Sequence, residues 1–284
     1  MCFFVLLVIY TTKRRNSYIL ICYFCINIIY MKILLLFLFI VFNTSAQNID
    51  FEKVGVKSAK FDVFWGNDIS GNNYFSTSNN LYKINEKDTL NYTNNKFGKI
   101  TGVETFNMLQ TLVFYKQNNA FVLLDAQFNE INAVIFSEIN CDFLKPASQN
   151  ELWFYDSLSQ QIGLYNLNAK NYKLLSNPLN KIIKQAHSDY NYLYWIDDEN
   201  NMYSINKFGK IASLGKVNPF EKVIFSDKSD LFCLFNDKIY YYSVENQSQV
   251  DIAIDEKMIK NFFYKDGILS IFTNYQISIY QIKK

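Results

Sequence analysis

Residues Leu152–Leu167 read LWFYDSLSQQIGLYNL, in which two short runs of aromatic and aliphatic residues flank a polar segment. Aromatic and β-branched residues favour β-strands, and the Asp and Ser residues between the runs favour a turn. Two short strands joined by a polar turn make a β-hairpin. The stretch therefore predicts one hairpin, and the same pattern recurs along the chain.

The hairpin pattern occurs six times at nearly constant spacing. The other instances are Asn73–Ile84, Leu112–Leu124, Leu193–Ile205, Leu231–Val244 and Leu269–Ile282. The second strand begins at Leu81, Phe121, Ile162, Met202, Ile239 and Ile277, at steps of 40, 41, 40, 37 and 38 residues. A repeat of about 20–50 residues is typical of propellers and solenoids.

Weaker strand patterns lie on both sides of the hairpins. Before them they cover Lys60–Trp65, Ile100–Phe106, Cys141–Pro146, Ile182–His187, Glu221–Phe225 and Met258–Phe263. After them they cover Thr89–Thr93, Ile131–Phe136, Tyr172–Leu175, Ile211–Leu214 and Val250–Ile254. Four strands per repeat form the blade of a β-propeller, and we expect the first strand to lie innermost.

The two ends of the repeat region complement each other. The sixth repeat has three strands, whereas Ile49–Val56 (IDFEKVGV) supplies a spare strand before the first repeat. We expect this segment to pair with the last hairpin, because closing the ring removes exposed sheet edges. The sequence therefore predicts an all-β fold, a six-bladed β-propeller of four-stranded blades over residues 47–284, closed by an N-terminal strand.

One exact repeat does not follow this period. The hexapeptide NKFGKI occurs at Asn95–Ile100 and again at Asn206–Ile211, 111 residues apart, which is not a multiple of the repeat. We interpret both copies as turns, at different places in their blades, in which Gly adopts a positive φ.

Residues 31–46 have the features of a secretory signal peptide. Met31-Lys32 precedes the apolar run Ile33–Phe42, and Thr44-Ser45-Ala46 predicts cleavage after Ala46. The run is too short for a permanent membrane helix, so we expect no stable membrane span in the mature form. Residues 1–30 are interpreted as a mis-assigned upstream extension, with translation starting at Met31. The alternative is a pair of membrane segments that anchors the protein.

Charge and cysteine content narrow the function classes. Four of the 28 basic residues and none of the acidic residues lie in 1–46, which leaves 24 basic against 26 acidic residues. A near-neutral domain without basic clusters argues against nucleic-acid binding, which requires phosphate neutralisation. Cys141 and Cys233 fall in different repeats, and we interpret them as buried thiols, with a disulfide as the alternative. No Cys or His spacing indicates a zinc site.

The segment Glu151–Leu167, ELWFYDSLSQQIGLYNL, resembles the blade core of NHL-type six-bladed propellers. Those blades have an apolar strand, an Asp, a polar turn and a second apolar strand; Asp156 matches that Asp and Asp197 fits loosely. Lys116 and Thr273 stand near that position in other repeats, and the family's Gly-Asn turn is missing. Residues 48–284 also resemble exported propeller proteins of the bacterial cell envelope. The resemblance implies fold and compartment, and no site residues.

Several residues are candidates for chemistry, each with a structural alternative. His187 ends a predicted innermost strand, where it lines or caps the channel. Carboxylates in or near innermost strands are capable of converging there to bind a cation or act as acid and base; they are Asp62, Glu104, Asp142 and Glu221. We expect polar strand ends in a wet channel instead. Asp197-Asp198 lacks the Gly and terminal Glu of a calcium loop and predicts a solvated turn.

Three tryptophans raise the alternative of a sugar-stacking platform. Trp153 and Trp195 stand one and two residues after Leu152 and Leu193, so they point to opposite sheet faces. We expect core packing between blades for both, and we leave Trp65 unassigned.

The sequence assigns no catalytic, cofactor-binding or metal-binding residue. We expect a non-catalytic binding or scaffold module of the periplasm or cell surface, with a protein or glycan partner in the envelope and no cofactor. Fold alone does not imply function. The alternative is an envelope carbohydrate-active enzyme that uses carboxylates at the channel mouth.

Overall fold

The computed structural model describes residues 30–32, 49–68, 70–107, 109–148 and 150–283. The chain divides into two units, Met1–Asn48 and Ile49–Lys284. The expected signal peptide and upstream extension therefore lie outside the described residues, except for a helical segment at 30–32. In the described part of the chain, no helix is both long and apolar enough to cross a membrane.

The second unit contains six four-stranded antiparallel sheets, numbered here as blades 1 to 6 along the chain. Blade 1 comprises β2 (Val63–Asn67), β3 (Asn73–Thr77), β4 (Asn80–Ile84) and β5 (Thr89–Thr93). Blade 2 comprises β6 (Gly102–Asn107), β7 (Gln110–Tyr115), the short helix η2 (Lys116–Asn118), β8 (Ala120–Asp125) and β9 (Glu130–Ile135). Blade 3 comprises β10 (Cys141–Pro146), β11 (Glu151–Asp156), β12 (Gln161–Asn166) and β13 (Asn171–Leu174).

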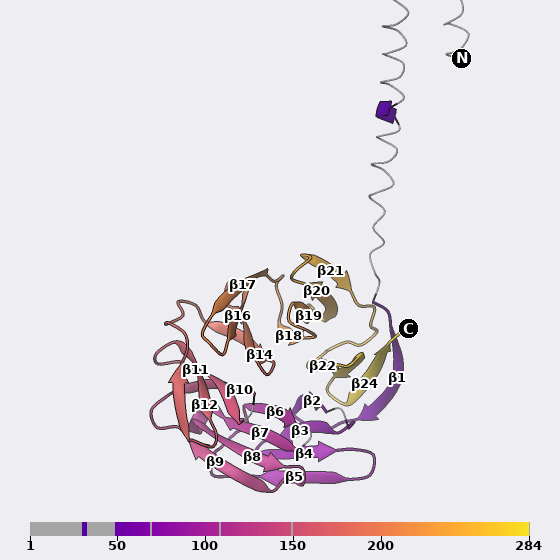
Figure 1. Cartoon of the computed structure of the whole chain (residues 1–284). Helices are drawn as coiled ribbons and strands as arrows, with labels where there is room; N and C mark the ends of the chain where they lie inside the picture. Colours follow the sequence, from indigo (N-terminus) through magenta and orange to yellow (C-terminus); the bar gives the residue numbers. More distant parts are fainter. Residues whose placement is uncertain (1–29, 33–48, 69, 108, 149, 284) are drawn as a thin grey trace, which may run out of the picture. The chain divides into compact units, whose positions relative to one another are not determined.

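Blades 4 to 6 repeat this order. Blade 4 comprises β14 (Ile183–Ser188), β15 (Tyr192–Asp197), β16 (Asn201–Asn206) and β17 (Ile211–Lys216). Blade 5 comprises β18 (Lys222–Phe225), β19 (Asp230–Phe235), β20 (Lys238–Ser243) and β21 (Ser248–Asp251). Blade 6 comprises β22 (Asn261–Lys265), β23 (Ile268–Phe272), β24 (Gln276–Ile282) and, from the other end of the unit, β1 (Phe51–Ser58). The blades form a ring (Figure 1), as the repeat predicts.

The core lies between the blades because the middle strands bury both faces. In β11, Leu152 and Phe154 pack towards blade 2, whereas Trp153 and Tyr155 pack towards blade 4. This follows from the two-residue period of a strand. Among the described residues there are six such clusters, one between each pair of neighbouring blades. The six predicted repeat positions are at most 3% exposed, which confirms the period; they are Leu81, Phe121, Ile162, Met202, Ile239 and Ile277.

The ring is closed as expected, by antiparallel pairing of β1 with β24 from Phe51↔Ile282 to Ser58↔Gln276. The strand begins two residues later than the predicted Ile49–Val56. Phe51 is its buried anchor, with its ring 6.0 Å from that of Phe232 in an edge-on arrangement.

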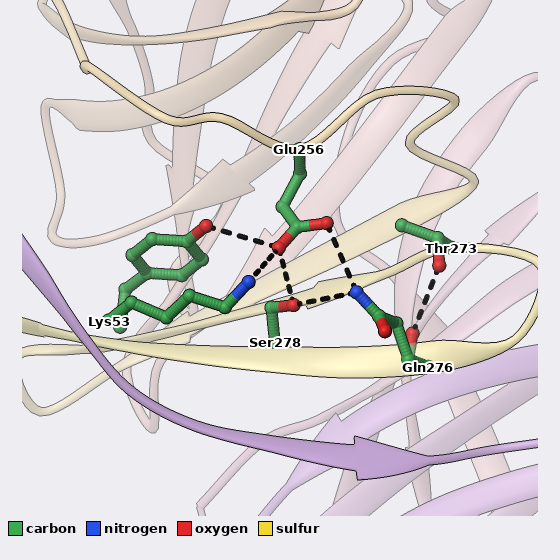
Figure 2. Close-up of polar contacts among 6 residues, drawn as sticks. Lys53, Glu256, Thr273, Gln276 and Ser278 are labelled. Carbon is green, nitrogen blue, oxygen red and sulfur yellow. Dashed lines mark hydrogen bonds and ion pairs between the residues drawn. The ribbon is translucent and has the colours of Figure 1, made fainter.

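A polar network connects β1, called the clasp strand here, to its neighbours (Figure 2). Glu256, in the link between β21 and β22, accepts hydrogen bonds on Oε1 from Lys53 Nζ at 2.6 Å and Ser278 Oγ at 2.5 Å. Tyr280 Oη donates to the same oxygen at 3.2 Å. Burial by itself raises the pKa of Glu256, but these donors outweigh it and hold the pKa below its ordinary value. The network therefore ties β1, β24 and the preceding link together as a charged group.

Both NKFGKI copies are turns, as predicted. Gly98 and Gly209 have φ of 78° and 82°, values that favour glycine. The first copy links blades 1 and 2, and the second joins β16 to β17.

Candidate binding site in the central channel

Burial alternates around Ala186 along the innermost strand β14. In β14, Ala186 is buried between blades, whereas Gln185 and His187 on either side of it border the channel cavities. The strand period of two residues sets this alternation. Residues of different blades that pair with equivalent positions of the next strand lie at the same height along the channel, which is called a level here. The strand pairing, followed inward from the six repeat positions, identifies the residues of each level.

At one level of the channel, the side chains from three neighbouring blades are polar. Blades 2, 3 and 4 place Glu104, Lys145 and His187 there, because these residues pair with equivalent positions of the neighbouring strands, namely Leu112, Trp153 and Tyr194. The three side chains thus succeed one another around the ring, as the six-fold repeat requires.

The opposite half of the same level is apolar. Blades 5, 6 and 1 place Ile224, Phe263 and Gly66 there. Gly66 has a φ of +129°, and a Cβ atom on it would lie 2.7 Å from the Phe263 ring. The absence of a side chain at Gly66 therefore provides the space that the Phe263 ring occupies. The adjacent Trp65 donates its indole N–H to Ser76 Oγ at 2.9 Å.

These residues surround a cavity of about 640 Å³ to which all six blades contribute. Its lining includes Trp65, Glu104, Lys145, His187, Phe225 and Tyr264. Tyr190, which is 63% exposed, stands at its rim in the β14–β15 turn. Such a mixture of aromatic surface and a few polar groups is characteristic of small-ligand pockets.

Five charged residues line this cavity, of which Glu104 and Lys145 form an ion pair; the others are Asp189, Lys265 and Asp266. Lys145 Nζ forms an ion pair with Glu104 Oε1, and their side chains are 18% and 30% exposed. Asp189 accepts the Asn191 and Tyr192 main-chain N–H groups at 2.8 Å, so it organises the turn that carries Tyr190. The pairing leaves the lining close to neutral at this level.

His187 lies in the channel as expected, with its side chain exposed to the cavity. Its ring stacks on Phe225, with centroids 5.1 Å apart and planes at 13°. Within the described residues its nitrogens have no hydrogen-bond partner. Desolvation by the surrounding channel walls, and secondarily the charge of Lys145, lowers the pKa of His187 to about 4, so the imidazole is neutral at pH 7.

The four carboxylates proposed to converge do not do so. Glu104 lines the large cavity. Glu221 lines a second cavity farther along the channel and accepts the Asn236 N–H at 3.1 Å. Asp142 pairs with Lys116, and Asp62 accepts the Ser78 N–H at 3.1 Å. They are distributed because Asp62, Asp142 and Glu221 stand at the starts of their strands, whereas Glu104 stands in the middle of β6.

The aspartates of the NHL-like pattern organise hairpin turns. Asp197 is 1% exposed and accepts the main-chain N–H groups of Glu199 at 2.9 Å and Asn201 at 2.7 Å. Asp156 accepts the hydroxyl of Ser159 at 2.6 Å. The prediction of a turn at Asp197-Asp198 is confirmed, but Asp197 itself is buried rather than solvated.

The tryptophan predictions are confirmed for Trp153 and Trp195, which are 0% and 3% exposed. They lie on facing sides of blades 3 and 4 and share one core cluster. Cys141 and Cys233 are buried free thiols in blades 3 and 5, as expected. In the described part of the chain, no group of three His, Cys, Asp or Glu residues has a metal-binding arrangement.

The sequence did not identify Lys145 as a channel residue or Tyr190 as a rim residue. The signal for Lys145 was present, since residues 104, 145 and 187 are one repeat apart. No comparable signal marks Tyr190, because it lies in a turn.

Comparison with known proteins shows the fold. No family model and no curated protein matches the chain. A streptogramin B lyase structure is similar with 11% identity and a TM-score of 0.55, covering 82% of this chain and 98% of that one. Virginiamycin B lyase from Staphylococcus aureus is similar with 13% identity and a TM-score of 0.53, covering 76% of this chain and 78% of that one. A chain of the Mitotic Checkpoint Complex is similar with 12% identity and a TM-score of 0.58, covering 85% of this chain and 95% of that one. At these identities the likeness concerns the propeller fold alone.

Proposed function

We propose that this protein is a non-catalytic binding module, exported to the periplasm or cell surface, that recognises its partner at the rim of the large channel cavity. The observation that carries the proposal is the state of the polar residues in that cavity. Glu104 is paired with Lys145, and His187 is stacked on Phe225 without a hydrogen-bonding partner. A general base needs a positioned partner and a pKa near the working pH, and neither applies to a histidine with a pKa of about 4.

The lining favours an uncharged glycan as the partner. Aromatic rings from blades 1, 4 and 6 accompany hydroxyl groups from Thr105, Ser188 and Ser226, and the Glu104–Lys145 charges neutralise each other. Aromatic faces and neutral hydrogen-bonding groups together suit a ligand with apolar faces and many hydroxyl groups. A protein segment is the other outcome that the test below distinguishes.

Purified protein is screened against an array of envelope glycans, and hits are quantified by calorimetry. Tyr190→Ala is expected to weaken binding about tenfold, since one well-packed aromatic contact contributes about 1–2 kcal/mol. Phe208→Ala is the matched control, because Phe208 lies in the same blade, is 94% exposed and lines no described cavity. An equal effect of both variants, or no glycan hit alongside Tyr190-dependent capture of one envelope protein, would overturn the glycan assignment.

The enzyme alternative is supported by one observation: Glu104 and His187 border the same cavity, and two structures of similar fold are lyases. Glu104→Gln, Asp142→Asn and His187→Ala separate the two hypotheses. Removing a true acid–base group lowers a turnover rate by about 10²–10⁴-fold. We expect no turnover of array hits by the unaltered protein and therefore no such loss.

The export part of the proposal rests on residues 31–46. The intact mass of the protein recovered from the envelope fraction is expected to correspond to a chain that starts at Gln47. A product that retains residues 31–46 would contradict this part and leave the binding proposal in place.

A further inference from the structure

A second cavity, of about 410 Å³, lies along the same channel. It is lined by residues from blades 4, 5 and 6 and shares Gln185, Val223 and Ile224 with the large cavity, so the two adjoin. Its charged lining consists of two lysines, Lys184 and Lys222, and one acid, Glu221.

The polar residues of this cavity occupy one level of the ring. Gln185, Lys222 and Asn261 pair with equivalent residues of the neighbouring strands, namely Ile196, Leu234 and Phe272. Blades 1, 2 and 3 have Val63, Gly102 and Phe143 at that level. Hydrogen-bond donors are therefore concentrated on three consecutive blades.

Neither lysine of this cavity has a carboxylate within ion-pair distance among the described residues, unlike Lys145 in the large cavity. Lys184 Nζ donates to Asn200 Oδ1 at 3.0 Å and lies 5.8 Å from the centroid of the Phe220 ring. Lys222 Nζ donates to the main-chain carbonyl of Lys260. Two ammonium groups thus face a cavity whose one acid, Glu221, bonds instead to a main-chain N–H.

Two further features suit an anion. The Lys222 side chain is exposed to the cavity, and partial desolvation by the channel walls lowers the pKa of its ammonium group. The side-chain amide of Gln185 makes no hydrogen bond to the described residues, so its two N–H donors are available. Asn261, in contrast, donates to the carbonyl of Phe64 at 2.7 Å and is held in place.

We propose that this cavity binds an oxyanion, the carboxylate or phosphate group of a small ligand. Lys222 and Lys184 supply the charge and Gln185 a neutral donor. The inference is independent of the glycan proposal, since it concerns the other cavity and a different ligand chemistry.

The test is a titration of the purified protein with acetate and with methyl phosphate at low ionic strength. Binding is followed by the main-chain amide NMR signals of β14 and β18. Saturable shifts at Gln185 and Lys222 are expected, and the tighter of the two probes identifies the class of anion. Lys222→Met is expected to weaken binding about tenfold or more, because it removes a charge-assisted hydrogen bond. Lys184→Met, on another strand, is expected to weaken it several-fold.

Lys265→Met is the matched control, since Lys265 lines the large cavity and not this one. Its affinity for both probes is expected to equal that of the unaltered protein. An equal loss in Lys265→Met would indicate general attraction to positive charge and overturn the proposal. Shifts that do not saturate, or that survive both Lys222→Met and Lys184→Met, would also overturn it. Melting curves of the variants identify any loss of affinity that comes from unfolding.

Discussion

Removal of the clasp strand tests the closure of the ring most directly. A chain that starts at Lys57 lacks residues 47–56 and with them five of the seven residues of β1 that pair with β24. It also lacks Lys53, so Glu256 loses its cationic partner. Blade 6 would then end at an unpaired β24, with the core between blades 5 and 6 open to water.

The magnitude follows from the contacts. Phe51 is buried, and full burial of such a side chain contributes about 1.5–3 kcal/mol. Val54 and Val56 are 55% and 51% exposed and add little. Five paired residues at roughly one hydrogen bond each, with about 1 kcal/mol net per bond, add about 5 kcal/mol. The sum of about 6–8 kcal/mol is comparable to the whole stability of a typical domain, about 5–15 kcal/mol.

The assay is thermal and urea unfolding followed by circular dichroism, with the chain from Gln47 as reference. At about 2–4 °C per kcal/mol for a domain of this size, the truncated chain is expected to melt at least about 12 °C lower. Phe51→Ala is expected to cost about 3–5 kcal/mol. The control Val54→Ser, in the same strand but exposed, is expected to change stability by less than about 0.5 kcal/mol. An unchanged Tm after truncation would refute closure by β1.

Three further outcomes are expected. Glu256→Gln should lower stability at neutral pH. Because the folded pKa of Glu256 lies below its ordinary 4.5, the stability that it contributes is present above about pH 4.5 and is lost on acidification, so the variant should show a shallower acid loss in pH-dependent melts. His187→Phe should also reduce acid sensitivity. The unfolded chain binds this proton near pH 6.5 but the folded chain only near 4, so the unaltered protein loses stability as pH falls through that interval. Identical acid profiles would contradict the lowered pKa of His187. Cys141 and Cys233 should resist thiol reagents in the native state, because burial raises the pKa of both thiols, and they should react fully in denaturant.

Strand existence was predictable from the sequence, and strand ends were less so. The middle strands alternate and repeat, and β10 and β5 have the predicted bounds. β2 starts at Val63 rather than Lys60, and Phe61 before it stacks on Phe75 with ring centroids 4.5 Å apart. Apolar residues in the links, such as Phe61, also pack into the clusters between blades, so their sequence pattern is similar to that of strand residues.

Residue identity alone did not predict burial in the links and turns. Phe97 and Phe208 occupy the same place in the two NKFGKI copies, yet they are 5% and 94% exposed. Phe97 lies between blades 1 and 2 and its ring is 5.5 Å from that of Tyr115, whereas Phe208 is at a hairpin tip. The partners that decide this difference come from distant parts of the sequence.

The sequence predicted individual residues that line the channel but not which of them contact one another. Glu104 and His187 were expected there from their place in innermost strands. The Glu104–Lys145 pair joins residues 41 apart and depends on the level at which each strand enters the ring. The β-bulges in β2, β10 and β14 shift the channel residues that follow them by one residue, and no local pattern reveals these bulges.

The clasp also sets the order in which the chain is able to complete its fold during synthesis. β1 emerges first and its partner β24 last; Lys53 and Glu256 alone are 203 residues apart. Until β24 is available, β1 has no partner strand and the earlier blades form an open arc. Strands within a blade are joined by short loops, so their pairing has a small loop-closure entropy cost. Pairing of β1 with β24 joins the two ends of the domain and has the largest loop-closure entropy cost. A chain that lacks β24 therefore remains an open arc, because β1 has no partner strand.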